Sequence, residues 1–257
     1  MLADQLQACN LPPMTCLVMP CAAVFLVLGP ATAVQADAFA IKEITYAEIE
    51  EFVPRVLDFD GIGQPPEDSL LRLDGVAFGE RFLGQTVRPQ QDDELVWHEV
   101  LEAKTPVAPL QAMPGPRGHN LAIRRDSHWG SLALHPLGPK TGSGLGTGTL
   151  AISFDPPVCY LAFRSGIDGM SRFGWVNNTI LRGKPEGSLS LIFYDIHARR
   201  IGMFMRSYNP EGAIEVGYMQ TGQADPQISG VLLQNLDLGG IAIDDLRFDP
   251  ECPQKLY

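Results

Sequence analysis

Basic residues are scarce in this chain of 257 residues. It contains 19 Lys and Arg against 30 Asp and Glu, which gives a formal net charge of −11. Nucleic acids bind proteins chiefly through Lys and Arg contacts to phosphate, and anionic membrane surfaces attract the same side chains. The deficit therefore argues against both partners, and it leaves cation binding or plain solubility as explanations of the acidic excess.

Catalytic motifs are also missing. The five histidines show no metal-ligand spacing such as HExxH, and no GxSxG elbow is present. The Gly-rich stretch 138–148 lacks the GK[ST] ending of a phosphate loop. Asp126, Ser127 and His128 are sequence neighbours, and neighbours rarely assemble into a Ser–His–Asp triad. The sequence predicts no catalytic residue.

A leader is expected at the N-terminus. Residues 17–29 read LVMPCAAVFLVLG, an apolar run of signal-peptide length that is short for a membrane span. Ala36-Asp37-Ala38 has the small-x-small form of a signal-peptidase site, so we expect cleavage after Ala38, with Ala36 as the alternative. Residues 1–16 lack Lys and Arg, so either the true start is Met14 or the amino group alone supplies the charge. The prediction is an exported protein, periplasmic or extracellular, without a membrane anchor in the mature chain.

Residues 39–257 are expected to form a single β-sandwich domain. Apolar residues alternate with polar ones in many short runs, and turn residues separate the runs at the spacing of a sandwich. Only residues 46–52 suggest a helix, of one or two turns, and residues 84–120 are expected to be long loops with one strand near Val96. The expected strands lie at 55–60, 75–78, 121–125, 131–135, 150–154, 158–163, 175–181, 189–193, 200–205, 214–218, 231–233 and 241–248.

Three segments carry a family resemblance. GTLAISFDPPVCYLAF (148–163), LSLIFYDIHARRIG (189–202) and GGIAIDDLRF (239–248) resemble bacterial exported β-sandwich domains that are often followed by a PEP-CTERM sorting tail. The chain departs from that group because it ends at LRFDPECPQKLY, without the tail. The resemblance implies an all-β, antiparallel jelly-roll like that of carbohydrate-binding modules. It implies no particular activity, because function depends on the site rather than on the fold.

Four aspartates form a candidate calcium site. Asp244 and Asp245 interrupt the alternation of the last expected strand, so either one Asp points toward the core or a bulge carries the pair. Asp58 and Asp60 lie on the expected first strand, and jelly-roll modules of the resembled type hold a structural Ca²⁺ between first and last strands. Carboxylate oxygens suit Ca²⁺. The alternative is that Asp244 and Asp245 bind backbone groups or Arg, with Asp58 and Asp60 on the surface.

Two tryptophans and two cysteines complete the candidate residues. Trp129 and Trp175 have polar neighbours and suit sugar stacking, although rings that cap the core would look the same. Cys159 and Cys252 are the two cysteines left after cleavage. They form either one disulfide in an oxidising compartment or two buried thiols.

The resulting hypothesis is an exported, non-catalytic binding or surface-associated module for polysaccharide or cell-surface glycan, with an optional structural Ca²⁺. Two alternatives stay open. A secreted carbohydrate-active enzyme on the same fold requires two carboxylates facing one cleft. A structural envelope or matrix protein requires self-association and no ligand.

Overall fold

Alternating apolar side chains build antiparallel sheets, so the all-β prediction is confirmed. The computed structural model describes residues 40–65, 67–91, 97–103, 105–126, 129–139, 145–166, 188–207, 212–222, 225–235 and 240–252. Contacts divide the chain after Ala36, and all described residues lie in the unit Asp37–Tyr257. Among them, no helix is long and apolar enough to cross a membrane.

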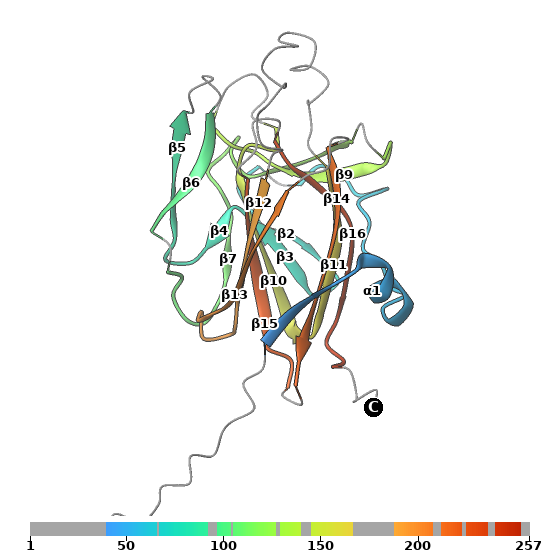
Figure 1. The fold of residues 1–257 in the computed structure, drawn as a ribbon. Coiled ribbons are helices and arrows are strands. Elements are labelled where there is room, and N and C mark those ends of the chain that lie inside the picture. Colours follow the sequence, from blue (N-terminus) through green and yellow to red (C-terminus); the bar gives the residue numbers. More distant parts are fainter. Residues whose placement is uncertain are drawn as a thin grey trace, which may run out of the picture. The chain divides into compact units, whose positions relative to one another are not determined.

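The first sheet has six strands, each antiparallel to its neighbours (Figure 1). This sheet joins segments from both ends of the described chain. Its edge strand, which begins at Ala40, pairs with a strand close to the C-terminal end. The register runs from Ala40 opposite Thr221 to Ile44 opposite Gly217. In spatial order the strands are β1 (Ala40–Ile44), β14 (Ala213–Thr221), β11 (Tyr160–Gly166), β16 (Ala242–Asp249), β9 (Leu132–Pro136) and β8 (Leu121–Arg125).

The second sheet also has six antiparallel strands, and two short ribbons accompany it. Its order is β13 (Arg200–Ser207), β12 (Ser188–Tyr194), β15 (Ile228–Asn235), β10 (Thr149–Val158), β3 (Val76–Gly79) and β2 (Leu71–Leu73). The ribbons are β4 (Arg81–Phe82) with β7 (Ala112–Met113), and β5 (Thr86–Gln91) with β6 (Trp97–Ala103).

The main core lies between the two sheets. Its buried residues include Leu161 and Phe163 from β11 and Leu191 from β12. The rings of Phe193 on β12 and Tyr218 on β14 meet across the layers with centroids 4.9 Å apart. Each large apolar side chain buried in this way contributes roughly 1.5–3 kcal/mol. The architecture is thus a β-sandwich, whereas its narrower assignment as a jelly-roll stays a prediction.

Tyr218 introduces a polar defect into this core. Its side chain is fully buried, and its hydroxyl has no hydrogen-bond partner among the described residues. Burial accordingly raises the pKa of Tyr218 above its usual value. A buried hydroxyl without a partner lowers stability because it has lost its hydrogen bonds to water.

Tyr218→Phe is therefore expected to raise the free energy of unfolding by about 1 kcal/mol, measured by urea denaturation. The matched control is Tyr194→Phe, which removes a hydroxyl that accepts a hydrogen bond from Gln85 Nε2 at 3.4 Å. The control is expected to destabilise the protein. A loss of stability in Tyr218→Phe would contradict the assignment of this hydroxyl as unbonded.

A second core covers the outer face of the second sheet. Phe82 of β4, Leu101 of β6 and Ala112 of β7 pack with Ala151 and Leu232 of the sheet. The two ribbons are therefore packed onto the second sheet as part of the folded unit. Figure 1 shows the β5–β6 ribbon at the side of the sandwich. This corrects the sequence expectation for residues 84–120, where loops were predicted and β5 was missed.

A short helix covers the outer face of the first sheet. The helix α1 (Tyr46–Phe52) begins with a capping box in which the Thr45 hydroxyl accepts a hydrogen bond from Glu48 N, and Glu48 accepts one from Thr45 N. Tyr46 and Ile49 are its buried residues, and they pack near Tyr160 and Ala162 of β11. The ambiguous segment is thus a helix of seven residues.

The predicted first strand at 55–60 is wrong. That segment is irregular apart from one bridge, in which Leu57 and Leu246 exchange backbone hydrogen bonds of 2.8 and 3.0 Å. The pattern RVLDFD alternates because Leu57 and Phe59 are buried between neighbouring segments rather than because the backbone is regular. The expected strand at 175–181 lies outside the described residues, as does Val96.

Candidate functional site

A bulge in β16 separates the two neighbouring aspartates. Ala162 of β11 faces Arg247, whereas Arg164 faces Asp244, so β16 contains one extra residue between these pairs. Asp245 lies at this point with a φ of +50°. The bulge directs the two carboxylates to different partners, which is the second of the two arrangements that the sequence allowed.

Asp244 is buried against the start of β9. Its carboxylate accepts hydrogen bonds from Ser131 Oγ at 2.5 Å and from Asp245 N at 2.8 Å. Burial is the largest cause that raises the pKa of Asp244, and the charges of Asp245 and Asp60 add to it. The ionised form of Asp244 is therefore destabilised by burial and by the carboxylates nearby.

Asp60, in the irregular segment 55–60, also binds the chain at the start of β9. Its Oδ1 accepts a hydrogen bond of 2.8 Å from Leu132 N, next to the serine that binds Asp244. Asp58 is exposed and accepts a hydrogen bond of 3.1 Å from Asp60 N. The structure thus brings Asp60 and Asp244 together at the start of β9.

The four predicted calcium ligands do not all converge. Asp245 instead pairs with Arg164 Nη1 at 2.7 Å. Within the described part of the chain, no three His, Cys, Asp or Glu side chains are grouped as a metal site requires. Calcium binding stays a prediction, and its strongest part is the pair Asp60 and Asp244.

An arginine clamp fastens α1 to the first sheet. Arg247 is largely buried and donates to Tyr46 Oη at 2.9 Å and to Glu50 Oε1 at 2.6 Å. It also donates to the carbonyl oxygens of Val53 and Pro54, both at 3.0 Å. The Tyr46 ring lies within 5.5 Å of its guanidinium carbon, at cation–π distance. The clamp fixes the position of Tyr46, and with it one wall of an adjacent groove.

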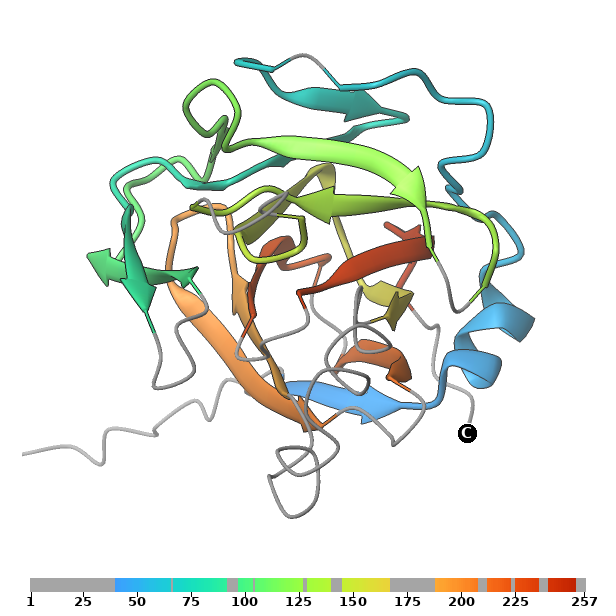
Figure 2. The ribbon, with the colours of Figure 1, turned by 90° about the horizontal axis from the view of Figure 1, so that it is seen from above.

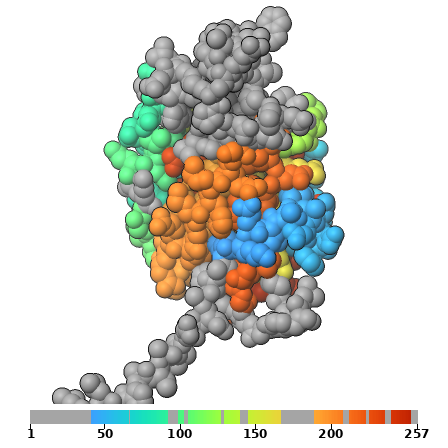
Figure 3. Space-filling model, viewed as in Figure 1, coloured from blue at the N-terminus to red at the C-terminus, as the bar shows by residue number. Residues whose placement is uncertain are grey.

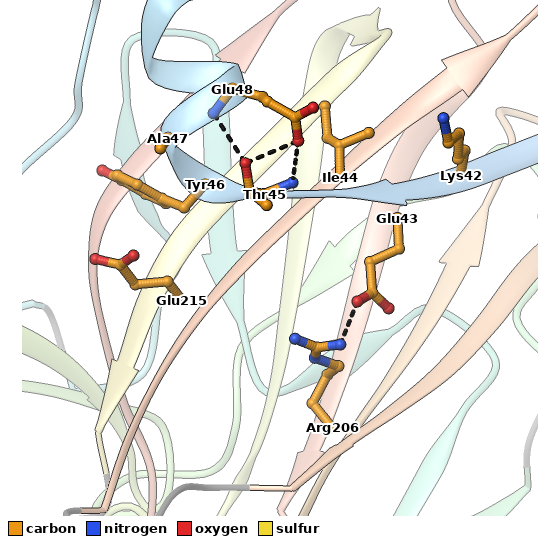
Figure 4. A pocket seen from close by; sticks show the side chains of 9 residues that line it. All are labelled: Lys42, Glu43, Ile44, Thr45, Tyr46, Ala47, Glu48, Arg206 and Glu215. Carbon is orange, nitrogen blue, oxygen red and sulfur yellow. Dashed lines mark hydrogen bonds and ion pairs between the residues drawn. The ribbon is translucent and has the colours of Figure 1, made fainter.

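The groove lies where β1 ends and α1 begins. It has a volume of about 430 Å³. Figure 3 shows the blue surface of β1 and α1 beside the orange surface of the second sheet at this place. Figure 4 shows Glu43 and Lys42 pointing to opposite sides of β1, with Glu43 toward Arg206. The lining residues are Lys42, Glu43, Ile44, Thr45, Tyr46, Ala47, Glu48, Arg206 and Glu215.

Ion pairs hold most of the charged groups that line the groove. Glu43 pairs with Arg206 across the two sheets, and Glu215 Oε1 accepts a hydrogen bond of 3.1 Å from Arg164 Nε. The Thr45 N–H and the Thr45 hydroxyl both donate to the Glu48 carboxylate, and these two hydrogen bonds lower the pKa of Glu48. Lys42 is exposed and makes no ion pair with a described residue. The groove therefore combines fixed carboxylates with two cationic groups, Lys42 and Arg206.

The remaining predicted residues are the two tryptophans and the two cysteines. Trp129 is half-buried, and its backbone N–H donates to Asp126 Oδ1 at 3.3 Å; Trp175 lies outside the described residues. Trp129 does not line the groove. Cys159 and Cys252 form a disulfide, with Cα atoms 5.0 Å apart. The bond ties the residue before β11 to the chain that follows β16.

Sequence reasoning missed a buried pair of acids. Glu80 and Glu99 are 1% and 4% exposed, and both contact Thr149: its hydroxyl donates to Glu80 O at 2.7 Å, and its N–H donates to Glu99 Oε2 at 3.2 Å. Arg81 pairs with Glu80. Burial first, and the charge of Glu80 second, raise the pKa of Glu99 to about 8. No sequence signal distinguishes these two acids from the exposed ones.

Family models and curated proteins provide no relative of this chain. No family model matches the chain, and no curated protein matches it. The resemblance to PEP-CTERM-associated domains and carbohydrate-binding modules therefore stays a prediction.

Proposed function

We propose that the chain is an exported, non-catalytic binding module that holds a glycan segment in the groove beside β1 and α1. The observation that carries the proposal is the groove itself. Its volume of about 430 Å³ falls within the range that small-ligand sites occupy. Its lining is mainly polar, with acceptors and donors on four separate elements, β1, α1, β13 and β14. This composition suits a polyhydroxylated ligand better than an apolar one.

Sugar hydroxyls both donate and accept hydrogen bonds, so they need both kinds of partner. The carboxylates of Glu43 and Glu215 supply acceptors, and Arg206 and Lys42 supply donors. The bonds to Arg206 and Arg164 hold the two carboxylates in place before a ligand arrives. Groups that are fixed in advance lose less conformational entropy on binding, which favours affinity.

Export is supported by two independent features. The apolar segment 17–29 has the length of a signal-peptide core, and a small-x-small cleavage motif follows it at 36–38. The disulfide between Cys159 and Cys252 is of a kind that persists mainly in oxidising compartments. Together they favour a periplasmic or extracellular protein.

The test is a glycan array with the purified protein, followed by calorimetric titration of each retained glycan. Glu215→Gln and Arg206→Gln are expected to weaken binding by about tenfold or more, since each removes a hydrogen bond to a charged group. Glu251→Gln is the matched control, because Glu251 is exposed and outside the groove. Equal affinity in all variants would place the site elsewhere, and retention of no glycan would overturn the proposal.

Calcium binding is tested separately, by thermal unfolding. We propose Asp60 and Asp244 as the centre of an optional structural site, supported by their shared position at Ser131 and Leu132. Thermal unfolding with EDTA and then with added Ca²⁺ is expected to show a rise in midpoint that Asp244→Asn abolishes. An unchanged midpoint would contradict the calcium site and leave the glycan proposal in place.

A further inference from the structure

The buried pair Glu80 and Glu99 lies where a ribbon meets the second sheet. Glu99 is on β6, and Thr149 is on β10; the Thr149 N–H donates to the Glu99 carboxylate, and the Thr149 hydroxyl donates to the backbone carbonyl oxygen of Glu80. Glu99 N also donates to Thr147 O at 3.0 Å, so both the backbone and the side chain of Glu99 attach the ribbon to the residues at the start of β10. Leu101, two residues further along β6, is buried in the second core. These contacts make Glu99 a central point of attachment for the β5–β6 ribbon.

Among the described residues, Glu99 has no cation paired with it alone. The charged groups that act on it are Glu80, which opposes its ionisation, and Arg81, which favours it but is paired with Glu80. On β5, Arg88 is exposed and bound to Gln90 Oε1 at 3.2 Å. β15, which packs against β6, contains no ionisable residue, and Glu102 on β6 itself is exposed. An ionised Glu99 would therefore add a second buried negative charge at this interface.

We propose that Glu99 is a proton-dependent latch, which holds the β5–β6 ribbon on the second sheet while protonated and releases the ribbon as the solution becomes alkaline. Protonated, the side chain accepts the Thr149 N–H without a net charge. Ionised, it faces Glu80 inside the contact between ribbon and sheet.

The sign of the pH dependence follows from the raised pKa. The ordinary value for a Glu is 4.5, and Glu99 in the folded protein titrates at about 8. Between these two values the folded protein holds a proton that the released ribbon would give up, so attachment weakens as pH rises. Below 4.5 the attachment has its full strength, and above about 8 the contribution of the proton is gone.

The test is hydrogen exchange of the purified protein at pH 5, 7 and 9, corrected for the intrinsic pH dependence of exchange. Protection of the ribbon amides, such as those of Val87, Val100 and Leu101, is expected to fall about tenfold or more from pH 5 to pH 9. Strands of the first sheet are expected to keep their protection, which separates ribbon release from global unfolding.

Glu99→Gln keeps an oxygen acceptor for Thr149 N–H and cannot ionise, so its ribbon is expected to stay protected at pH 9. Glu102→Gln is the matched control on the same strand, and it is expected to lose protection as the wild type does. Equal loss in Glu99→Gln and wild type would overturn the latch. If Glu99→Gln does not fold, the wild-type profile decides, because pH-independent protection of the ribbon would overturn the proposal as well.

Discussion

Removal of the Cys159–Cys252 disulfide is expected to lower the free energy of unfolding by about 4 kcal/mol. The bond closes a loop of 93 residues, which contains all the strands from β11 to β16, so without it the unfolded chain gains much conformational freedom. The measurement is urea denaturation of the wild type and of a Cys159→Ala, Cys252→Ala double variant. Because Cys9, Cys16 and Cys21 lie in the expected leader, both proteins are made without residues 1–38, and the double variant then has no thiol.

Chemical reduction supplies the control for this prediction. Dithiothreitol is expected to lower the unfolding midpoint of the wild type and to leave that of the double variant unchanged. A wild type that is insensitive to dithiothreitol, with all thiols shown to be reduced, would contradict a stabilising role for the bond.

Arg247→Ala is expected to cost about 3 kcal/mol of stability, because it breaks a buried charge network. The change removes the donor to the Tyr46 hydroxyl, the ion pair with Glu50 and the hydrogen bonds to two backbone carbonyl oxygens after α1. Those carbonyl oxygens, of Val53 and Pro54, would then lack their donor. Thermal unfolding measures the loss, and hydrogen exchange should locate it at α1.

Two further variants sharpen the arginine experiment. Arg247→Lys keeps the charge but lacks the planar fork that reaches several acceptors, so it is expected to recover only part of the stability. Arg72→Ala on β2 removes an exposed arginine and is expected to change stability by less than about 0.5 kcal/mol. An Arg247→Ala variant as stable as Arg72→Ala would show that the clamp contributes nothing to folding.

Many of the strands, and the bulge as one of two alternatives, could be predicted from the sequence because their signals are local. The run from Leu150 to Phe154 alternates with period two, and β10 contains it. Asp244 and Asp245 broke the alternation of the last strand, which left a bulge as one of two solutions. The helix also has a local signal, since Thr45 and Glu48 have the spacing of a capping box.

The candidate site could not be read in the same way because it depends on distant contacts. Glu43 and Arg206 meet only after β1 has paired with β14 and the two sheets have stacked. Glu99 looks like the exposed Glu102 three residues later, and only the position of the ribbon over the second sheet buries it. Both the ion pair and the burial of Glu99 depend on tertiary packing, which no local sequence pattern encodes.

The ion pair between Glu43 and Arg206 also bears on aggregation. β1 and β13 are the outermost strands of the two sheets on one side of the sandwich, and Figure 2 shows them lying beside each other. An open strand edge recruits other chains, and charged side chains and close covering segments discourage this. A side chain added at Gly202 of β13 would come within 3.2 Å of Ile41 of β1, so β1 already occupies the space beside this part of the edge. Assembly of copies by strand addition is therefore disfavoured on this side of the sandwich.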